Sequence, residues 1–438
     1  MDSTINAHTR RCLAAIAASG GEGSRTFTQV YAQSALTEAD AADQRHQRGT
    51  ALSRVDGSAV AVKDLFDVAG QTTWAGSMVL RDAPAAVADA PAVASLRRGG
   101  SVIVGKTNMT EFAYSGLGLN PHFGTPANPY RRAVQRRIPG GSSSGAAIAV
   151  TDGMADIGLG TDTGGSVRIP AALCGLVGWK PSARRISLAG VWPLAPTFDS
   201  VGVIARSVNV CIDTDAVLAE AMSMAAPPPL NRLRLARVRG YIETELDSEV
   251  ADAYESAILR LARAGVQIVD LNIPSLERVP RELPGVTMPT YEAFRTHEKL
   301  LAQCAEAYDP RVRYRLELGR RISAEEYAAA ASVRKELQRA ATDALQDFDA
   351  WLLPTVAIVA PPFAVFDSDE RYLAINRKVL RNASLINFLD GCAITLPCHE
   401  GDSPPVGLSI AGLQVRDARV LAIAKSLEPI VRMAAPGE

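Results

Sequence analysis

Residues 139–145 read PGGSSSG and residues 160–170 read GTDTGGSVRIP, and the chain is organised around these two glycine–serine segments. Residues 146–159 between them are mostly small and apolar, and they are long enough for one helix and one strand. Such a unit lets the two segments face each other. A nucleophilic serine needs exposure, a proton acceptor and nearby backbone N–H groups for the oxyanion, and neighbouring glycines keep those groups accessible. The two segments therefore predict a site of serine chemistry.

Composition excludes several other classes of function. The 438 residues are 47% apolar, which is ample for a large core, and 46 basic against 47 acidic residues leave a net charge of −1. No basic block favours a nucleic-acid partner, and no apolar run reaches the length of a membrane span. The six cysteines lack CxxC spacing, which is typical of reduced thiols in a cytoplasmic protein. The five histidines form no HExxH motif, so we expect no metal site, and no cofactor is expected either.

The chain between residues 57 and 129 has the pattern of an α/β protein. Residues 57–64 (GSAVAVKD) predict a buried strand that places Lys63 at the end of a sheet. A helix over 85–98, ended by two glycines, and a strand over 101–106 follow. Residues 107–129 predict a long loop of the kind that lines active sites.

The remaining pattern predicts one domain. We expect a catalytic core at about 55–230 and 348–438, and a helix-rich peripheral part at about 231–347. The expected strands are 198–205, 233–238, 266–271, 350–354, 393–397 and 406–410; the expected helices are 26–48, 208–221, 248–264 and 416–431; residues 175–181 are expected to form a turn.

One interpretation of the first segment is a Ser-His-Asp hydrolase. Residues 141–145 match G-x-S-x-G with Ser143 as nucleophile, and His399 with Asp367 or Asp390 would complete the chain order. However, that motif requires a buried strand immediately before it, and arginine-rich residues stand there instead. A phosphate-binding loop is also disfavoured, because there is no GxxxxGK[ST], and Thr163 occupies the place of the third glycine of GxGxxG.

A different interpretation pairs the two segments with Lys63. A lysine acts as a general base only when its pKa falls from ~10.4 toward ~7–8, and burial lowers it. The end of an apolar strand suits that role. The structural alternative is a salt bridge between Lys63 and Asp64 or another acid, which the serine segments make less attractive.

Four segments together resemble the amidase signature family. They are AVKD at 61–64, GKTNMTEF at 105–112, PGGSSSG at 139–145 and GTDTGGSVRIPAA at 160–172. The resemblance is dense over about residues 55–210 and thins across 230–347. It implies an α/β fold with a large mixed, mostly parallel central β-sheet covered by helices on both faces.

The resemblance also implies roles for individual residues. Ser166 matches the nucleophile, Lys63 the catalytic lysine, and Ser142 the serine between them, which usually follows a cis peptide bond. The other matches are the backbone N–H groups of Thr163, Gly164, Gly165 and Ser166 in the oxyanion hole; Ser143, Asp162 and Arg168, which orient the network; and Met109, Gly141 and Thr161 in the substrate pocket.

These matches imply an amidohydrolase that cleaves the C–N bond of a small amide through an acyl-enzyme on Ser166. Aliphatic or aryl amides, carboxylated ureas and dicarboxylic monoamides are all compatible substrates. The main alternative within the family is the glutaminase-like subunit of a tRNA-dependent amidotransferase, which works with a partner. A homodimer is compatible with the sequence. Two positions depart from the usual pattern: Ala146 stands where many relatives carry Ser, and residues 130–138 are unusually rich in arginine.

Overall fold

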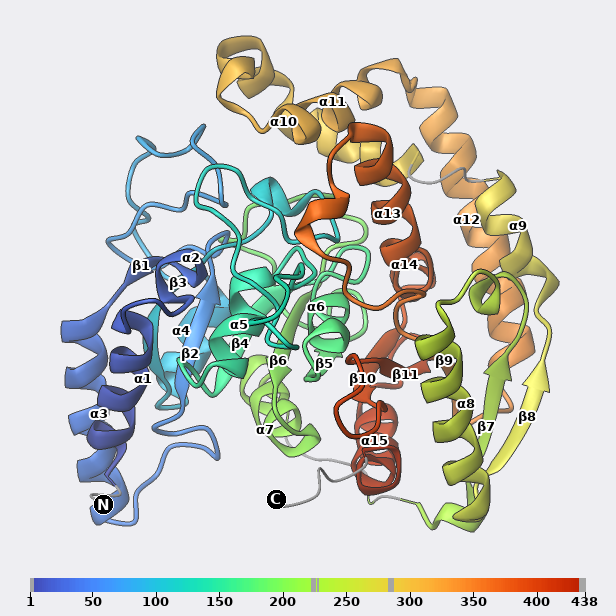
Figure 1. The fold of residues 1–438 in the computed structure, drawn as a ribbon, viewed down its shortest axis with the longest axis horizontal. Helices are drawn as coiled ribbons and strands as arrows, with labels where there is room; N and C mark the ends of the chain where they lie inside the picture. The colour runs from blue at the N-terminus through green and yellow to red at the C-terminus, as the bar shows by residue number, and fades with distance from the viewer. Residues whose placement is uncertain (1–3, 222–225, 227, 283–286, 433–438) are drawn as a thin grey trace.

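The computed structural model describes residues 4–221, 226, 228–282 and 287–432, and it folds around one large β-sheet (Figure 1). The strands are β1 Phe27–Val30, β2 Ala59–Lys63, β3 Val102–Thr107, β4 Ile157–Thr161, β5 Val177–Lys180, β6 Val201–Ala205, β7 Arg234–Val238, β8 Gln267–Leu271, β9 Ala350–Pro354, β10 Cys392–Pro397 and β11 Gly407–Gly412. The α-helices are α1 Ile5–Ala17, α2 Gly23–Thr26, α3 Ala32–Gln47, α4 Pro91–Arg98, α5 Ser144–Thr151, α6 Arg168–Leu173, α7 Val208–Leu218, α8 Ser248–Arg263, α9 Pro274–Glu282, α10 Thr287–Cys304, α11 Pro310–Leu318, α12 Ala324–Leu345, α13 Asp369–Arg381, α14 Ala383–Phe388 and α15 Asp417–Val431.

The sheet has 11 strands in the order β1-β3-β2-β4-β6-β5-β10-β11-β9-β7-β8. Its mixed character confirms the prediction, but the expectation of mostly parallel pairing is wrong. The pairs β2–β3, β2–β4, β7–β8 and β7–β9 are parallel, and the other six described pairs are antiparallel. Short connections such as the one between β10 and β11 require antiparallel neighbours, because a parallel pair needs a crossover of a dozen residues or more.

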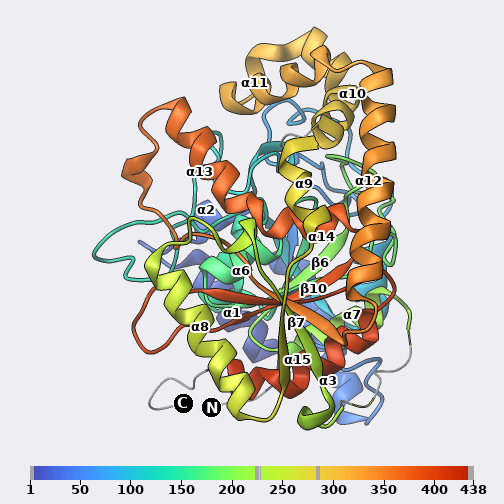
Figure 2. The same cartoon turned by 90° about the vertical axis from the view of Figure 1, so that its right-hand side faces the viewer.

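Helices cover both faces of the sheet, as predicted. On β2, Val60 and Val62 pack in the same cluster as residues of α4 and α7, whereas Ala59 and Ala61 pack in the cluster that contains Ala149 of α5. This alternation follows from the two-residue period of a strand. Figure 2 shows the sheet nearly edge-on, with α6 and α14 above it and α7 and α15 below. Inner strands such as β2, β4 and β10 are therefore buried on both sides, which explains why they read as apolar runs rather than alternating patterns, whereas the edge strands β1 and β8 are partly exposed.

Most of the predicted elements are confirmed within a few residues. The helix–strand unit between the two glycine–serine segments is α5 followed by β4, and Lys63 is the last residue of β2. Two predictions were wrong: residues 175–181 contain strand β5 instead of a turn, and residues 27–30 form strand β1 within the expected helix. Strands β7 and β8 also join the main sheet, so residues 231–347 are not purely peripheral.

Helices α10 and α11 are tied to the loop that follows β3 and to the loop that precedes β6. The backbone N–H of Asp309, which caps α11, donates to the buried carboxylate of Glu111 at 2.7 Å, and the hydroxyl of Tyr114 donates to Thr290 of α10 at 2.9 Å. The backbone N–H of Thr197 donates to Glu292 of α10 at 2.9 Å. These bonds fix α10 and α11 over the loops. None of the described helices combines the length and apolarity needed to cross a membrane.

Candidate active site

Lys63 lies at the carboxyl end of β2, between two parallel neighbours, and its side chain is fully buried. Its Nζ is 2.8 Å from the Oγ of Ser142 and 2.9 Å from the Oγ1 of Thr161. Burial lowers the pKa of Lys63 to about 7, against the opposing charges of Asp162 and Asp199. The amine is therefore uncharged in a large share of molecules near neutral pH, and it contacts two hydroxyl groups.

The backbone around Ser142 is held by the long loop after β3. The Gly141–Ser142 peptide bond is cis, as the resemblance implies. The N–H of Thr110 donates to the carbonyl of Ser142 at 3.1 Å, and the N–H of Gly141 donates to Gly116 at 2.8 Å. A Cβ on Gly141 would lie 2.5 Å from the backbone nitrogen of Gly118, so only glycine lets the two loops approach this closely.

The second segment brings Ser166 to the first. The N–H of Ser143 donates to the carbonyl of Ser166 at 3.2 Å, so the residue after Ser142 is tied to Ser166. Within the described residues no hydrogen bond to the Ser166 hydroxyl is found, and the residue is 3% exposed. Ser166 thus presents a free hydroxyl at the site.

The turn that carries Ser166 is anchored on Asp162. The carboxylate accepts from the N–H of Gly165 at 2.8 Å and of Val167 at 3.2 Å. It also accepts two bonds from the Arg168 guanidinium, at 2.9 and 3.0 Å, and both side chains are fully buried. Burial raises the pKa of Asp162, but the charge and hydrogen bonds of Arg168 outweigh it and hold that pKa well below its usual range. The carboxylate therefore stays ionised and fixes the turn.

The predicted oxyanion hole needs one correction. The N–H of Gly165 already donates to Asp162, so it is not available to a substrate oxygen. Among the described residues no partner is found for the N–H groups of Thr163, Gly164 and Ser166. These three donors remain as candidates. Gly165 adopts φ +116°, and a Cβ there would lie 2.5 Å from the Cβ of Ala383 on α14.

The structure adds residues that sequence reasoning missed. Asn387 on α14 donates to the carbonyl and the carboxylate of Asp162, both at 2.9 Å, and accepts from Arg168 at 2.7 Å. Asp199 accepts from the Thr163 hydroxyl at 2.5 Å, and burial raises the pKa of Asp199 to about 6 against the hydrogen bonds that it accepts. No local sequence signal marks Asn387, because it lies 225 residues from Asp162.

The residues proposed for the substrate pocket lie in different environments. Met109 is fully buried in the apolar core. Gly141 packs against Gly118, and the hydroxyl of Thr161 contacts Lys63. Thr161 thus belongs to the lysine network.

The Ser-His-Asp interpretation finds no support in the geometry. The hydroxyl of Ser143 is fully buried and donates to the carbonyl of Thr161 at 3.4 Å. The ring of His399 lies beside Gly175, and Asp390 binds Arg334 at 2.7 Å. No hydrogen bond between Ser143 and His399 is found in the described part of the chain.

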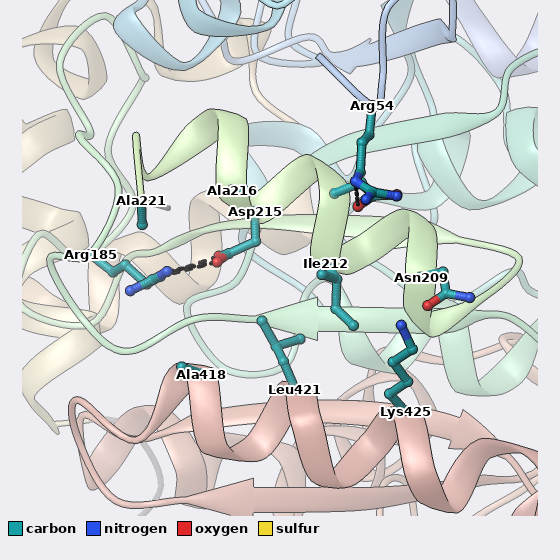
Figure 3. A pocket seen from close by; sticks show the side chains of 11 residues that line it. Arg54, Arg185, Asn209, Ile212, Asp215, Ala216, Ala221, Ala418, Leu421 and Lys425 are labelled. Carbon is teal, nitrogen blue, oxygen red and sulfur yellow. Dashed lines mark hydrogen bonds and ion pairs between the residues drawn. The ribbon is translucent and has the colours of Figure 1, made fainter. Parts of the chain in front are cut away.

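A separate cavity of about 530 Å³ lies between α7 and α15 (Figure 3). Asp215 at its rim binds Arg185 at 2.8 Å, and Lys425 of α15 points toward α7. None of the residues described above lines this cavity, so we do not assign it to the site.

Comparisons with known proteins agree with the sequence resemblance. The family model described as "Amidase" matches residues 8–421. The chain is 34% identical over 412 residues to the 2-amino-5-chloromuconic acid deaminase of Comamonas testosteroni, which covers 93% of this chain and 88% of that protein. It is 31% identical over 441 residues to a glutamyl-tRNA(Gln) amidotransferase subunit of Koribacter versatilis, covering 90% of this chain and 88% of that protein. A solved amidase structure matches with a TM-score of 0.86 at 31% identity, over 98% of this chain and 97% of that one. The chain therefore belongs to the amidase family and is an enzyme that hydrolyses amide C–N bonds.

Proposed function

We propose that this enzyme hydrolyses a small amide through a relay of Lys63, Ser142 and Ser166. The observation that carries the proposal is the fully buried amine of Lys63, 2.8 Å from the hydroxyl of Ser142. A pKa of about 7 for Lys63 suits a general base, because such a base works best when its pKa lies near the working pH.

In the first step, Ser166 Oγ attacks the amide carbonyl carbon and forms the new C–O bond. Its proton passes to Ser142, whose own proton passes to the neutral Nζ of Lys63. The carbonyl electrons move to oxygen, and the free N–H groups of the turn stabilise the resulting oxyanion. The relay then returns the proton to the leaving nitrogen, the C–N bond breaks, and an ester on Ser166 remains.

In the second step, water hydrolyses that ester. The neutral relay takes one proton from the attacking water, and the Ser166 oxygen recovers a proton as the C–O bond breaks. The products are a carboxylic acid and an amine or ammonia, and the enzyme returns to its starting state. No group other than these side chains and water is needed for the balance.

Two relatives support different readings of the substrate. The 2-amino-5-chloromuconic acid deaminase supports a free-standing enzyme that acts on a small molecule. The glutamyl-tRNA(Gln) amidotransferase relative supports the alternative of a glutaminase-type chain that needs a partner. We favour the first, and we also propose a cytoplasmic location, which the free cysteines among the described residues support.

The experiment is turnover of the isolated chain on a panel of small amides and esters, with mass-spectrometric trapping of the acylated residue. We expect hydrolysis without a partner and acylation of Ser166. Ser166→Ala should lower turnover at least about 10⁴-fold. Ser144→Ala is the matched control, because its buried hydroxyl in the same segment has no partner among the described residues. Acylation of Ser143 would refute the relay. If glutamine is the only substrate that is hydrolysed, and only after a partner subunit is added, the result would favour the amidotransferase alternative.

A further inference from the structure

An aromatic cluster includes one residue of α10 and residues of loops that are hydrogen-bonded to the segments of the candidate site. It consists of Phe112, Trp192, His297 of α10 and Tyr308. The ring centroids of Phe112 and His297 are 4.3 Å apart, and those of Trp192 and His297 are 5.9 Å apart. The rings therefore pack as one group.

Short backbone connections tie this aromatic cluster to the active site. The N–H of Trp192 donates at 2.9 Å to Leu65, two residues after Lys63. Leu194, two residues further on, donates at 3.0 Å to Asp199, which holds Thr163 of the oxyanion turn.

The opposite side of the cluster is tied to the serine loop. Phe112 follows Thr110 by two residues, and the N–H of Thr110 donates to Ser142. Tyr308 precedes Asp309, whose N–H donates to Glu111 beside Phe112. The aromatic cluster is thus linked through neighbouring residues to the segments of both Lys63 and Ser142.

Two ring nitrogens in the aromatic cluster are buried without a partner. They are Nε1 of Trp192 and Nε2 of His297, and both lack any hydrogen bond in the described part of the chain. Leaving such a group unpaired costs about 1–3 kcal/mol, so each of these nitrogens calls for a partner, such as a bound water or a ligand atom.

The chemistry of the two nitrogens can be assigned. An indole nitrogen is only a donor. The His297 Nδ1 is 3.0 Å from the Tyr308 hydroxyl. If that hydroxyl donates to Nδ1, the ring hydrogen is on Nε2, and this N–H is the only group without a hydrogen-bond partner. If Nδ1–H instead donates to the hydroxyl, both Nε2 and the hydroxyl hydrogen lack a partner. Burial lowers the pKa of His297 to about 3, so the ring is neutral. Both nitrogens are therefore neutral N–H donors.

We propose that Trp192 Nε1 and His297 Nε2 together bind a second carbonyl or carboxylate oxygen on the acyl part of the substrate. The inference rests on the proposed function. When a small primary amide is hydrolysed, only ammonia leaves, so a second oxygen of the substrate must belong to the acyl part that is bound to Ser166. The flat apolar faces of the aromatic cluster suit a short hydrocarbon or conjugated chain that joins the amide carbonyl of the substrate to its second oxygen. Trp192 as a whole is only partly buried, whereas its ring nitrogen is buried.

The test compares matched substrates. Succinamate, glutaramate and adipamate carry a distal carboxylate, and butanamide, pentanamide and hexanamide carry a methyl group instead. For Trp192→Phe and His297→Phe we expect kcat/KM on the best carboxylated amide to fall at least about tenfold, with less than a threefold change on its hydrocarbon partner. His297→Gln, which keeps a donor near the Nε2 position, should recover part of the loss. Trp351→Phe is the matched control, because it removes another buried, unpartnered indole N–H in a different cluster.

Equal losses on both substrate series would assign the aromatic cluster a purely structural role, and no loss on either would mean that water alone occupies it; both results overturn the inference. A second measurement does not need turnover. Carboxylated amides should raise the melting temperature of Ser166→Ala protein, and the rise should disappear when Trp192→Phe is added. If the Ser166→Ala protein shows no such rise while the wild-type enzyme still acylates Ser166 with hydrocarbon amides, this inference alone is overturned. If no amide acylates Ser166, the proposed function is refuted instead.

Discussion

The pH dependence of hydrolysis tests the central role of Lys63. Only the neutral amine can accept a proton from Ser142, and burial lowers the pKa of Lys63 from an ordinary 10.5 to about 7. The neutral fraction is then about one half at pH 7, about one tenth at pH 6 and about one hundredth at pH 5. We expect kcat/KM to fall about tenfold per pH unit below pH 7 and to level off above pH 8.

The assay is ammonia release from an amide without titratable groups, between pH 5 and 9, with circular dichroism at each pH to show that the protein remains folded. Two buried carboxyl groups also titrate near this acid limb, because burial raises the pKa of Asp64 to about 7 and that of Asp199 to about 6. Burial lowers the pKa of Lys180 only to about 8, which lies above the limb. Variants separate the three assignments.

Asp64→Asn should leave the acid limb in place. Asp199→Asn removes a negative charge that raises the pKa of Lys63, so its limb should move to lower pH. A limb that vanishes in either variant would assign it to that carboxyl. A wild-type profile that stays flat from pH 5 to 8 would refute the neutral-lysine relay.

Three further predictions concern stability and geometry. Lys63→Met should abolish turnover, yet it should raise the free energy of unfolding in urea at pH 7 by about 2–4 kcal/mol. The reason is that, between pH 7 and 10.5, Lys63 is protonated in the unfolded chain but neutral in the folded protein, which destabilises the wild-type fold. The gain should therefore shrink as pH rises toward 10. Asp162→Asn should destabilise by about 3–5 kcal/mol at pH 7, because it leaves the buried charge of Arg168 without its partner, and a loss under 1 kcal/mol would contradict the anchoring role. Gly165→Ala should lower kcat at least about tenfold by displacing the oxyanion turn, whereas Gly153→Ala, also at positive φ but with open space around it, should change only stability, by about 1 kcal/mol.

The fold was predictable where the signal is local. The strand that ends at Lys63 is a continuous apolar run, and the helix that ends at Arg98 is followed by two glycines, so both elements follow from neighbouring residues. Strand β5 was missed because it is only four residues long, contains Gly178 and is buried on both faces. The proportion of antiparallel pairs was also missed, because strand order depends on contacts far apart in sequence.

The site was predictable where the motif itself carries the chemistry. Ser142, Ser166 and Lys63 stand in recognisable segments, and the structure brings Lys63 to Ser142 and ties Ser166 to the residue after it. Asn387 was out of reach, since α14 lies more than 200 residues away and no pattern predicted that helix. The hydrogen bond from the Gly165 N–H to Asp162 could not be predicted either, because the sequence does not show whether a backbone N–H is free or paired.

The structure also explains why one lysine among several is suited to act as a base. Lys63, Lys106 and Lys180 are all fully buried, and burial lowers the pKa of each. Lys180 donates to two backbone carbonyls, at 2.7 Å each, and a carbonyl has no proton to give.

Lys106 contacts a carbonyl, the Thr73 hydroxyl and, at 3.7 Å, the buried carboxylate of Asp64. The Thr73 hydroxyl itself donates to Asp67 at 2.7 Å. Among these three lysines, only Lys63 contacts hydroxyl groups that are not found to donate to another acceptor in the described part of the chain. These hydroxyls belong to Ser142 and Thr161. Burial lowers the pKa of the amine in all three cases, and the type of partner decides which amine can take a proton from a serine.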